Sequence, residues 1–285
     1  MTEKFINPFT DFGFKKLFGE DQNKDILIDF LNQLLPKEDH IKDLSFHKNE
    51  HYARTAEDRR AIFDLYCENQ DGEKFIIELQ RAKQANFKDR SLYYASFPIQ
   101  EQAEPGTEWK FRLKGVYTVC IMDFVFDEHE EDELLHQVKL MNIKTKKVFY
   151  DKLTFIYLET PKFRKQLHEL ETRFDKWLYL LRNLNRLTDR PLQLQERVFQ
   201  KFFDAAEIAK YTPVQLEDYR ESLKILRDYY GTLENREMEG FEKGLEKGLK
   251  EGVVKVAKNL LTIGLSSEQI SQTTGLSIDE IEALR

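Results

Sequence analysis

Three polar residues in one short segment have the types and the spacing of a metal-assisted phosphodiesterase site. The segment reads AIFDLYCENQDGEKFIIELQ and contains Asp64, Glu78 and Gln80. Its Asp-Gly step lies between two runs of β-forming residues, which predicts a hairpin turn. Folding the segment there brings Asp64 opposite Glu78, to within about one residue of register. Gln80 shares the strand face of Glu78, because alternate residues of a strand point the same way.

The opposed carboxylates predict a divalent cation. Like charges about 5 Å apart across a ladder destabilise a sheet unless something neutralises them. Two carboxylates with a strand carbonyl suit Mg²⁺, which keeps several waters and accepts phosphate oxygens as ligands. A metal in this position can lower the pKa of a bound water and polarise a scissile phosphate. The spacing therefore favours metal-assisted phosphodiester hydrolysis.

A structural alternative is that these acids form the polar face of an amphipathic sheet. Against it, the same face carries Ile62, Tyr66 and Ile76, so that the acids lie among apolar groups. The opposite face is expected to carry the remaining apolar residues of the two strands, Phe63, Leu65, Phe75, Ile77 and Leu79.

The elements around this hairpin predict an α/β core followed by helices. Strands are expected near 41–47, 61–68, 74–81, 114–126, 136–143 and 153–159, and helices near 14–18, 23–35, 86–103, 161–187 and 191–211. A further helix is expected to open at Thr212-Pro213, an N-cap followed by a first-turn proline. The order of these elements predicts one nuclease-sized core and a helical continuation.

Composition excludes several classes of protein. The chain has 285 residues, with 41% hydrophobic and 33% charged residues, which is too apolar for a disordered chain. No stretch approaches the roughly 20 apolar residues of a membrane span, and the first residues do not fit a signal peptide. Cys67 and Cys120 lie in apolar runs and are expected to be buried, reduced thiols. These features predict that the protein is cytoplasmic. The net charge of -7 argues against a protein that coats nucleic acid.

Several segments together resemble a known family. They are INPFTDFGFKKLFG at the start, DRRAIFDLYCENQDGEKFIIELQRAKQANFKDRSLYYAS, KGVYTVCIMDFVF and LETPKFRKQLHELETRFDKWLYLL, in this order within about residues 1–187. This pattern resembles the Rpn family of recombination-promoting nucleases and transposases, which have a PD-(D/E)XK nuclease domain. The resemblance implies a restriction-endonuclease-like αβββαβ core, Mg²⁺-dependent DNA cleavage with Mn²⁺ as a substitute, and metal-binding acids at Asp64 and Glu78.

The chain departs from the general superfamily pattern where (D/E)XK has lysine. It has Gln80 there, a form that the Rpn group shares. Glutamine orients a water or a substrate oxygen through hydrogen bonds but supplies no positive charge. A lysine from elsewhere, Lys15 or Lys83, would have to substitute.

Other candidates are less specific than the acidic pair. Asp11 and Lys15 lie one helical turn apart and are candidate catalytic residues, although a cap or a surface pair has the same spacing. Four basic residues after the third strand are candidates for phosphate contacts, and a solvated helix face is the alternative for each. They are Arg81, Lys83, Lys88 and Arg90.

The C-terminal region has a glycine at every fourth position from Gly240 to Gly252. This stripe suits either close approach of another helix or a weak connecting helix, because each glycine costs about 1 kcal/mol against alanine. Short helices near 253–263, 266–273 and 277–284 are expected to form a helix-turn-helix-like piece, whose acidic last helix favours docking or regulation over DNA reading.

These observations predict three regions and one leading function. Residues 1–160 would be the nuclease core, 161–235 a helical extension and 236–285 a module for self-association or a regulatory contact. The leading hypothesis is a metal-dependent DNA endonuclease linked to recombination or to defence against mobile DNA. The alternative is a DNA-binding or protein-interaction module with little catalysis. Nothing in the residues indicates strand-transfer chemistry.

Overall fold

A computed structural model describes residues 3–48, 50–51, 61–84, 86–103, 112–125 and 133–284. The chain divides into two compact units, Met1–Leu223 and Lys224–Arg285. Among the described helices, none combines the length and the apolar character that a membrane span requires.

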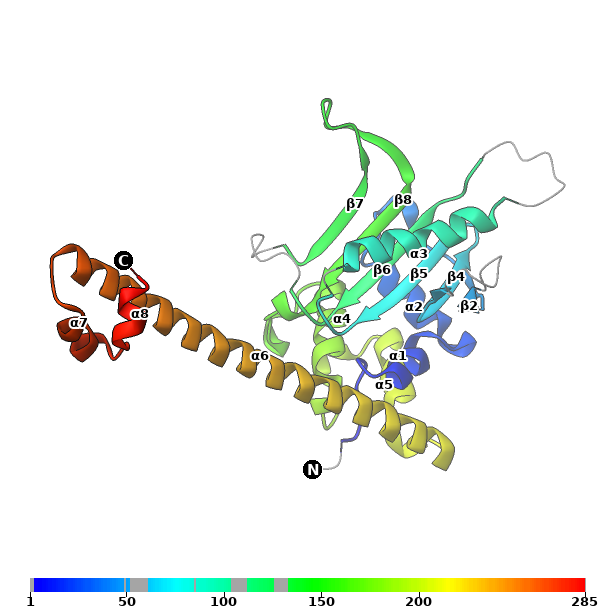
Figure 1. Ribbon diagram of the computed structural model, residues 1–285. Helices are drawn as coiled ribbons and strands as arrows, with labels where there is room; N and C mark the ends of the chain where they lie inside the picture. The colour runs from blue at the N-terminus through cyan, green and yellow to red at the C-terminus, as the bar shows by residue number, and fades with distance from the viewer. Residues whose placement is uncertain are drawn as a thin grey trace. The chain divides into compact units, whose positions relative to one another are not determined.

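The first unit contains a mixed six-stranded sheet (Figure 1). Its strands are β1 (Leu44–Phe46), β4 (Leu65–Asn69), β5 (Lys74–Gln80), β6 (Val116–Met122), β7 (Leu135–Met141) and β8 (Val148–Glu159). They lie in the order β1-β4-β5-β6-β8-β7, and β5, β6 and β8 are mutually parallel. A separate pair joins β2 (Glu50–His51) to β3 (Ala61–Ile62).

Five helices accompany the sheet in this unit, and short 3₁₀ turns connect them. The helices are α1 (Asp11–Phe18), α2 (Lys24–Leu31), α3 (Phe87–Glu101), α4 (Arg173–Asn183) and α5 (Arg197–Ala206). The 3₁₀ turns are η1 (Asp21–Asn23), η2 (Lys37–Asp39), η3 (Thr160–Lys162), η4 (Leu167–Glu169), η5 (Leu184–Arg186), η6 (Leu192–Leu194) and η7 (Ile208–Lys210). The succession α2, β1, β4, β5, α3, β6 is the predicted αβββαβ core, so the fold class is confirmed.

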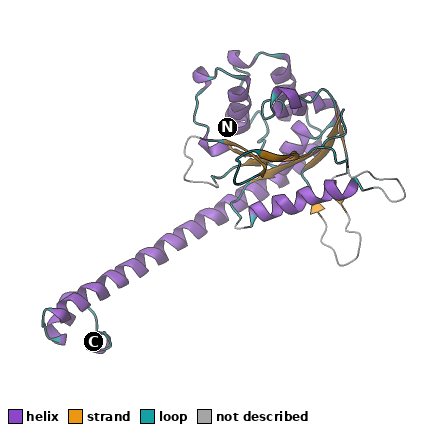
Figure 2. Ribbon diagram, turned by 90° about the horizontal axis from the view of Figure 1, so that it is seen from above, coloured by secondary structure: helices purple, strands orange, loops and turns teal. Residues whose placement is uncertain are grey.

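Helix α3 covers one face of the sheet, and the other helices of the unit gather on the opposite face (Figures 1 and 2). Phe87 and Ala95 of α3 pack against Cys120, Met122 and Tyr157 from β6 and β8. Strand β6 is buried along its whole length because both faces are covered, which explains the nearly continuous apolar run predicted as one strand at 114–126.

The opposite face is packed by an aromatic cluster around Trp177 of α4. Its ring contacts Phe30 of α2 and both Phe199 and Phe202 of α5, with centroids 5.0 to 5.7 Å apart. The indole Nε1–H donates to Asp29 Oδ1 at 2.8 Å. Helices far apart in the sequence are thereby joined into one core.

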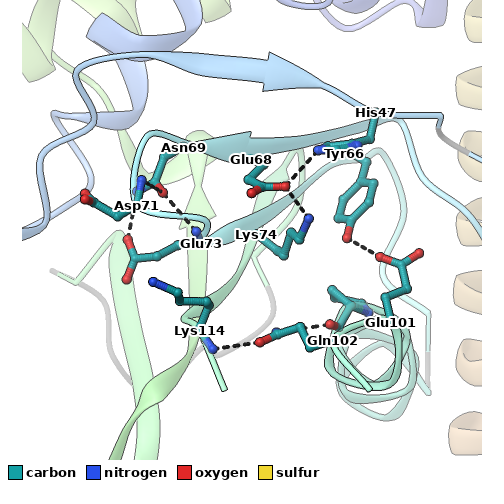
Figure 3. Close-up of polar contacts among 11 residues, drawn as sticks. His47, Tyr66, Glu68, Asn69, Asp71, Glu73, Lys74, Glu101, Gln102 and Lys114 are labelled. Atoms are coloured by element: carbon teal, nitrogen blue, oxygen red, sulfur yellow. Dashed lines mark hydrogen bonds and ion pairs between the residues drawn. The ribbon is translucent and has the colours of Figure 1, made fainter. Parts of the chain in front are cut away.

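The β4–β5 hairpin closes through the predicted Asp-Gly turn. Gly72 has φ +80°, a conformation that glycine adopts without strain. Next to this turn, Glu68 pairs with Lys74 across the strands and with His47 Nε2 at 3.1 Å (Figure 3). Polar contacts thus fix the closed end of the hairpin, and His47 has a structural partner there.

Two predicted helices begin later in the chain than the sequence suggested. The helix expected at 161–187 begins only at Arg173, because Thr172 caps it with Asp175 in a capping box and the preceding residues form 3₁₀ turns after Pro161. The helix expected at 191–211 is confined to α5 and is preceded by a 3₁₀ turn.

The C-terminal region differs from the prediction in one respect. Helix α6 (Pro213–Thr262) is continuous through all four repeated glycines, so the expected separate helix at 253–263 is wrong. Good helix formers between the glycines and pairs such as Glu239–Lys243 favour continuity. Helices α7 (Ser267–Thr274) and α8 (Ile278–Glu282) follow, and Ser266 and Ser277 cap them. They share a small core centred on Ala257, Ile270 and Ile281.

The packing of Trp177 predicts that α4 is integral to the first unit. Replacing this fully buried ring in Trp177→Ala should lower the free energy of unfolding by about 3–5 kcal/mol, from lost burial and an unfilled cavity. Denaturant titration of the full chain measures it. Leu192→Ala, at a side chain that is 87% exposed, is the control and should change stability by less than about 0.5 kcal/mol. Equal effects of the two substitutions would contradict this account of the core.

Candidate functional site

Asp64 lies directly across the hairpin from Glu78. The register pairs Leu65 with Ile77, so the next residues outward, Asp64 and Glu78, oppose one another as the sequence pattern predicts. Asp64 sits where the strand expected at 61–68 is interrupted, between β3 and β4. The backbone of Asp64 is therefore not part of a strand at the position where it approaches Glu78.

Three hydrogen bonds hold the two carboxylates in place. The backbone N–H of Leu79 donates to Asp64 Oδ2 at 2.6 Å. The backbone N–H of Asp64 donates to Glu78 Oε1 at 3.3 Å, and the Gln80 side-chain amide donates to Glu78 Oε2 at 3.0 Å. Each carboxylate accepts at least one donor, which fixes its orientation before any ligand arrives.

Gln80 has a partner within the site that the sequence pattern does not reveal. Its buried side-chain amide donates to Glu78, and the predicted contact with water or substrate stays a prediction. The hydrogen bond from the Leu79 N–H to Asp64 could not be predicted from the sequence, because every residue except proline carries the same main-chain donor.

Burial makes both carboxylates hard to ionise. Glu78 is 6% exposed, and its burial, with the nearby Asp64 charge, raises its pKa to about 8. Burial likewise raises the pKa of Asp64, against the lowering effect of the Leu79 N–H. The pair shares a low-dielectric site in which two negative charges repel. A cation is the simplest agent that would let both groups ionise together.

The hairpin partly changes the predicted division of faces. Phe63 was expected on the face opposite the acids, but it packs with Tyr66 and Ile76, beneath Tyr94 of α3. It lies in the gap between β3 and β4, where the alternation of faces is interrupted. Ile62, which was expected among the buried groups around the acids, is 58% exposed.

Helix α1 brings a second charged pair near the acids. Lys15 and Asp11 form an i,i+4 ion pair at 2.9 Å, and both side chains are about half exposed. Both charges influence the pKa of Asp64: Asp11 raises it and Lys15 lowers it. The end of α1 is fixed close to β4, since a Cβ on Gly19 would lie 2.6 Å from Leu65 Cδ2.

The predicted phosphate-contact residues divide into two groups. Arg81 lowers the pKa of Asp64 and Arg90 lowers that of Glu78, which places both guanidinium groups within electrostatic range of the acids. Lys83 and Lys88 are exposed. Tyr94 also faces the site, because the Glu78 charge helps burial to raise its pKa.

The donor set fits a hydrated divalent cation. Within the part of the chain that the structure describes, no group of three or more His, Cys, Asp or Glu side chains is arranged to hold a metal. Asp64 and Glu78 offer two carboxylates, and main-chain carbonyl, water and phosphate oxygens would complete a shell. Mg²⁺ accepts such a sparse protein set, whereas a structural zinc site does not.

The αβββαβ order and the mixed sheet are those of the PD-(D/E)XK nuclease fold. The family model of the PD-(D/E)XK nuclease family transposases matches residues 8–236, and the chain belongs to this family. Membership indicates a nuclease or transposase type of function with DNA as the substrate. No curated protein and no solved structure shows a significant match to the chain.

The raised pKa of Glu78 predicts a pH-dependent stability of the metal-free protein. A carboxyl whose pKa rises on folding from 4.5 to about 8 favours the folded state below about pH 4.5. That contribution is lost as the pH rises toward 8, at about 1.4 kcal/mol per pKa unit. In EDTA, the Tm of the wild type should therefore fall more between pH 5 and 8.5 than that of Glu78→Gln.

Asp71→Asn, at the exposed hairpin turn, removes one charge from the same segment and is the control. It should retain the pH dependence of the wild type. Parallel Tm profiles for the wild type and Glu78→Gln would show that Glu78 titrates as it does in the unfolded chain.

Proposed function

We propose that the protein is a Mg²⁺-dependent DNA endonuclease that hydrolyses phosphodiester bonds, with Asp64 and Glu78 as metal ligands and Mn²⁺ as a substitute. One observation carries the proposal: the buried Glu78 carboxylate and the partly buried Asp64 carboxylate face each other across the β4–β5 hairpin of a nuclease fold.

The chain's own residues would orient and neutralise the reacting groups. Bound Mg²⁺ would supply a water of lowered pKa and would polarise the phosphate. Gln80 positions Glu78, and Leu79 positions Asp64, each through the hydrogen bond described above. Lys15 would provide the positive charge that glutamine lacks, since its ammonium already acts on Asp64.

Arg81 is the best-supported candidate for a phosphate contact. Its Nε is buried and has no hydrogen-bond partner among the described residues, and its charge acts on Asp64. A phosphate oxygen would satisfy that donor. Arg90, already bound to Gln84 at 2.9 Å, would contribute charge, and the exposed Lys83 and Lys88 would contact the backbone of DNA farther from the acids.

We also propose the compartment and the process in which this activity occurs. Cys67 and Cys120 are free and buried, which suits a reducing compartment such as the cytoplasm. The family description, which names transposases, supports a link to DNA recombination, and defence against mobile DNA is the alternative setting. Residues 236–285 would mediate self-association or a regulatory protein contact, because Phe241, Leu245 and Leu249 of α6 are exposed.

A second candidate function is a DNA-binding or interaction module with weak catalysis. The observation that favours it is the chain's Gln80, which is engaged with Glu78 and brings no charge to the site. Under this alternative the acids would remain protonated and DNA would be held but not cut.

Cleavage of supercoiled plasmid tests the proposal. The wild type should nick the plasmid with Mg²⁺ or Mn²⁺ and not with EDTA. Asp64→Asn and Glu78→Gln should each lower the rate by more than about 100-fold, because removal of a direct ligand should exceed the 10–100-fold loss typical of groups that only support a ligand. Gln80→Ala, as a positioning variant, should lower the rate by about 10–100-fold.

Asp71→Asn is again the charge-matched control and should cut at the wild-type rate. Nicking that persists in both Asp64→Asn and Glu78→Gln would remove these residues from the site. A wild type that binds the plasmid and leaves it intact with either metal would favour the second candidate function.

A further inference from the structure

The hairpin formed by β7 and β8 extends beyond the rest of the sheet (Figure 1). Strand β6 pairs with β8 only from Leu153 onward, so residues 148–152 pair with β7 alone. The pairing also shifts register at Leu140, which lies opposite Tyr150. We refer to residues 138–152 as the β7–β8 arm. Such a two-stranded ribbon, outside the sheet, has little packing of its own.

The β7–β8 arm exposes an unusual number of apolar side chains. They are Val138, Leu140, Met141, Ile143, Val148 and Phe149, each between 47% and 80% exposed. Ile143 and Phe149 near the tip are the most exposed, at 80% and 79%. Single exposed apolar residues are ordinary, but a cluster of this size marks an interaction site.

The same arm is strongly basic, although the chain has a net charge of -7. It contains five lysines and one acid: Lys139, Lys144, Lys146, Lys147, Lys152 and Asp151. Within the described part of the chain, no ion pair neutralises the first four of these lysines. Lys152 instead donates to the Leu113 carbonyl at 2.9 Å. The arm is thus a basic projection from an acidic protein.

The tip of the arm is a fixed turn. Asn142 Oδ1 accepts hydrogen bonds from the N–H groups of Lys144 and Thr145, both at 3.0 Å. Backbone bonds join Asn142 to Lys147 and Lys146 to Asn142, at 2.9 Å each. The lysines around this turn are therefore presented on an ordered scaffold, which lowers the entropy cost of binding.

We propose that the β7–β8 arm grips the DNA duplex away from the cleavage site, with lysines on phosphates and with Ile143 and Phe149 inserted into a groove. A basic ribbon with apolar side chains at its tip has the composition of arms that enter the minor groove and wedge between base steps. The choice of DNA over another polyanion rests on the proposed nuclease function. The charge contrast between arm and chain supports it, because the arm would attract the phosphates of DNA although the chain as a whole is acidic.

The distance between the arm and the acids fits one duplex. Glu78 aligns with Cys120 and then with Tyr157 across the sheet. Val148 lies nine residues earlier in the same strand as Tyr157, which is about 30 Å at 3.3 Å per residue. One turn of B-DNA is about 34 Å long, so a duplex that contacts both places would present equivalent faces to each.

Equilibrium binding of a duplex of about three helical turns, in EDTA, tests the arm without cleavage. The variant Lys139→Gln/Lys144→Gln/Lys147→Gln should bind at least about tenfold more weakly, and its slope of log K against log salt should be smaller by about 2 to 3. Ile143→Ala/Phe149→Ala should weaken binding and leave the slope unchanged, since no charge is removed. Far-UV circular dichroism and Tm check that each variant is folded.

Lys243→Gln/Lys247→Gln/Lys250→Gln on α6 removes the same charge and is the matched control. Equal losses in this control, wild-type affinity and slope in the arm variants, or no duplex binding by the wild type would each overturn the proposal. An arm variant whose mass in solution is half that of the wild type would also overturn the proposal, because the arm would then join two copies of the chain. Plasmid nicking is measured separately. Binding that depends on the arm, without any cleavage, would contradict the proposed endonuclease function and would still support DNA binding by the arm.

Discussion

The repulsion between two opposed carboxylates, of which Glu78 is buried and Asp64 partly buried, is the interaction on which the rest of this structure depends. Asp64 and Glu78 cannot both ionise cheaply in their surroundings, yet the fold brings them face to face. The rigid β4–β5 register and the overlying α3 hold this arrangement. An energetically unfavourable pair that the surrounding packing maintains is the usual signature of a functional site, because selection for stability alone would remove it.

The local backbone is adapted to this constraint. The strand breaks just where Asp64 lies, which frees its N–H for Glu78 and lets its carboxylate reach the N–H of Leu79. Gln80 completes the arrangement from the same strand face as Glu78. A lysine at this position would bring its own charge, whereas the glutamine stabilises the orientation of the acid. Under the proposed function the positive charge would come from outside β5, from Lys15 of α1 or from Arg81, whose charges act on Asp64.

The hairpin, its register and the αβββαβ order could be predicted because each follows from a local pattern. Asp-Gly specifies the turn, and alternation of residue types specifies the faces. The gap at Phe63 could not be predicted, since its β-forming residues continue the strand pattern and only tertiary contacts interrupt it. The late start of α4 at Arg173 and the continuity of α6 through its glycines were missed for a related reason. Caps and neighbouring helix formers outweighed the propensity of single residues. The partners of the site acids are main-chain groups and residues distant in sequence, which no motif encodes.

The most direct measurement of the central claim is an anomalous difference map from crystals of the full chain soaked in Mn²⁺. The account predicts a peak between the carboxylates of Asp64 and Glu78, and its loss in crystals of Asp64→Asn. A well-ordered site with both carboxylates in place and no anomalous peak would contradict it. So would a peak that persists in the variant, because the metal would then be held by residues other than this pair.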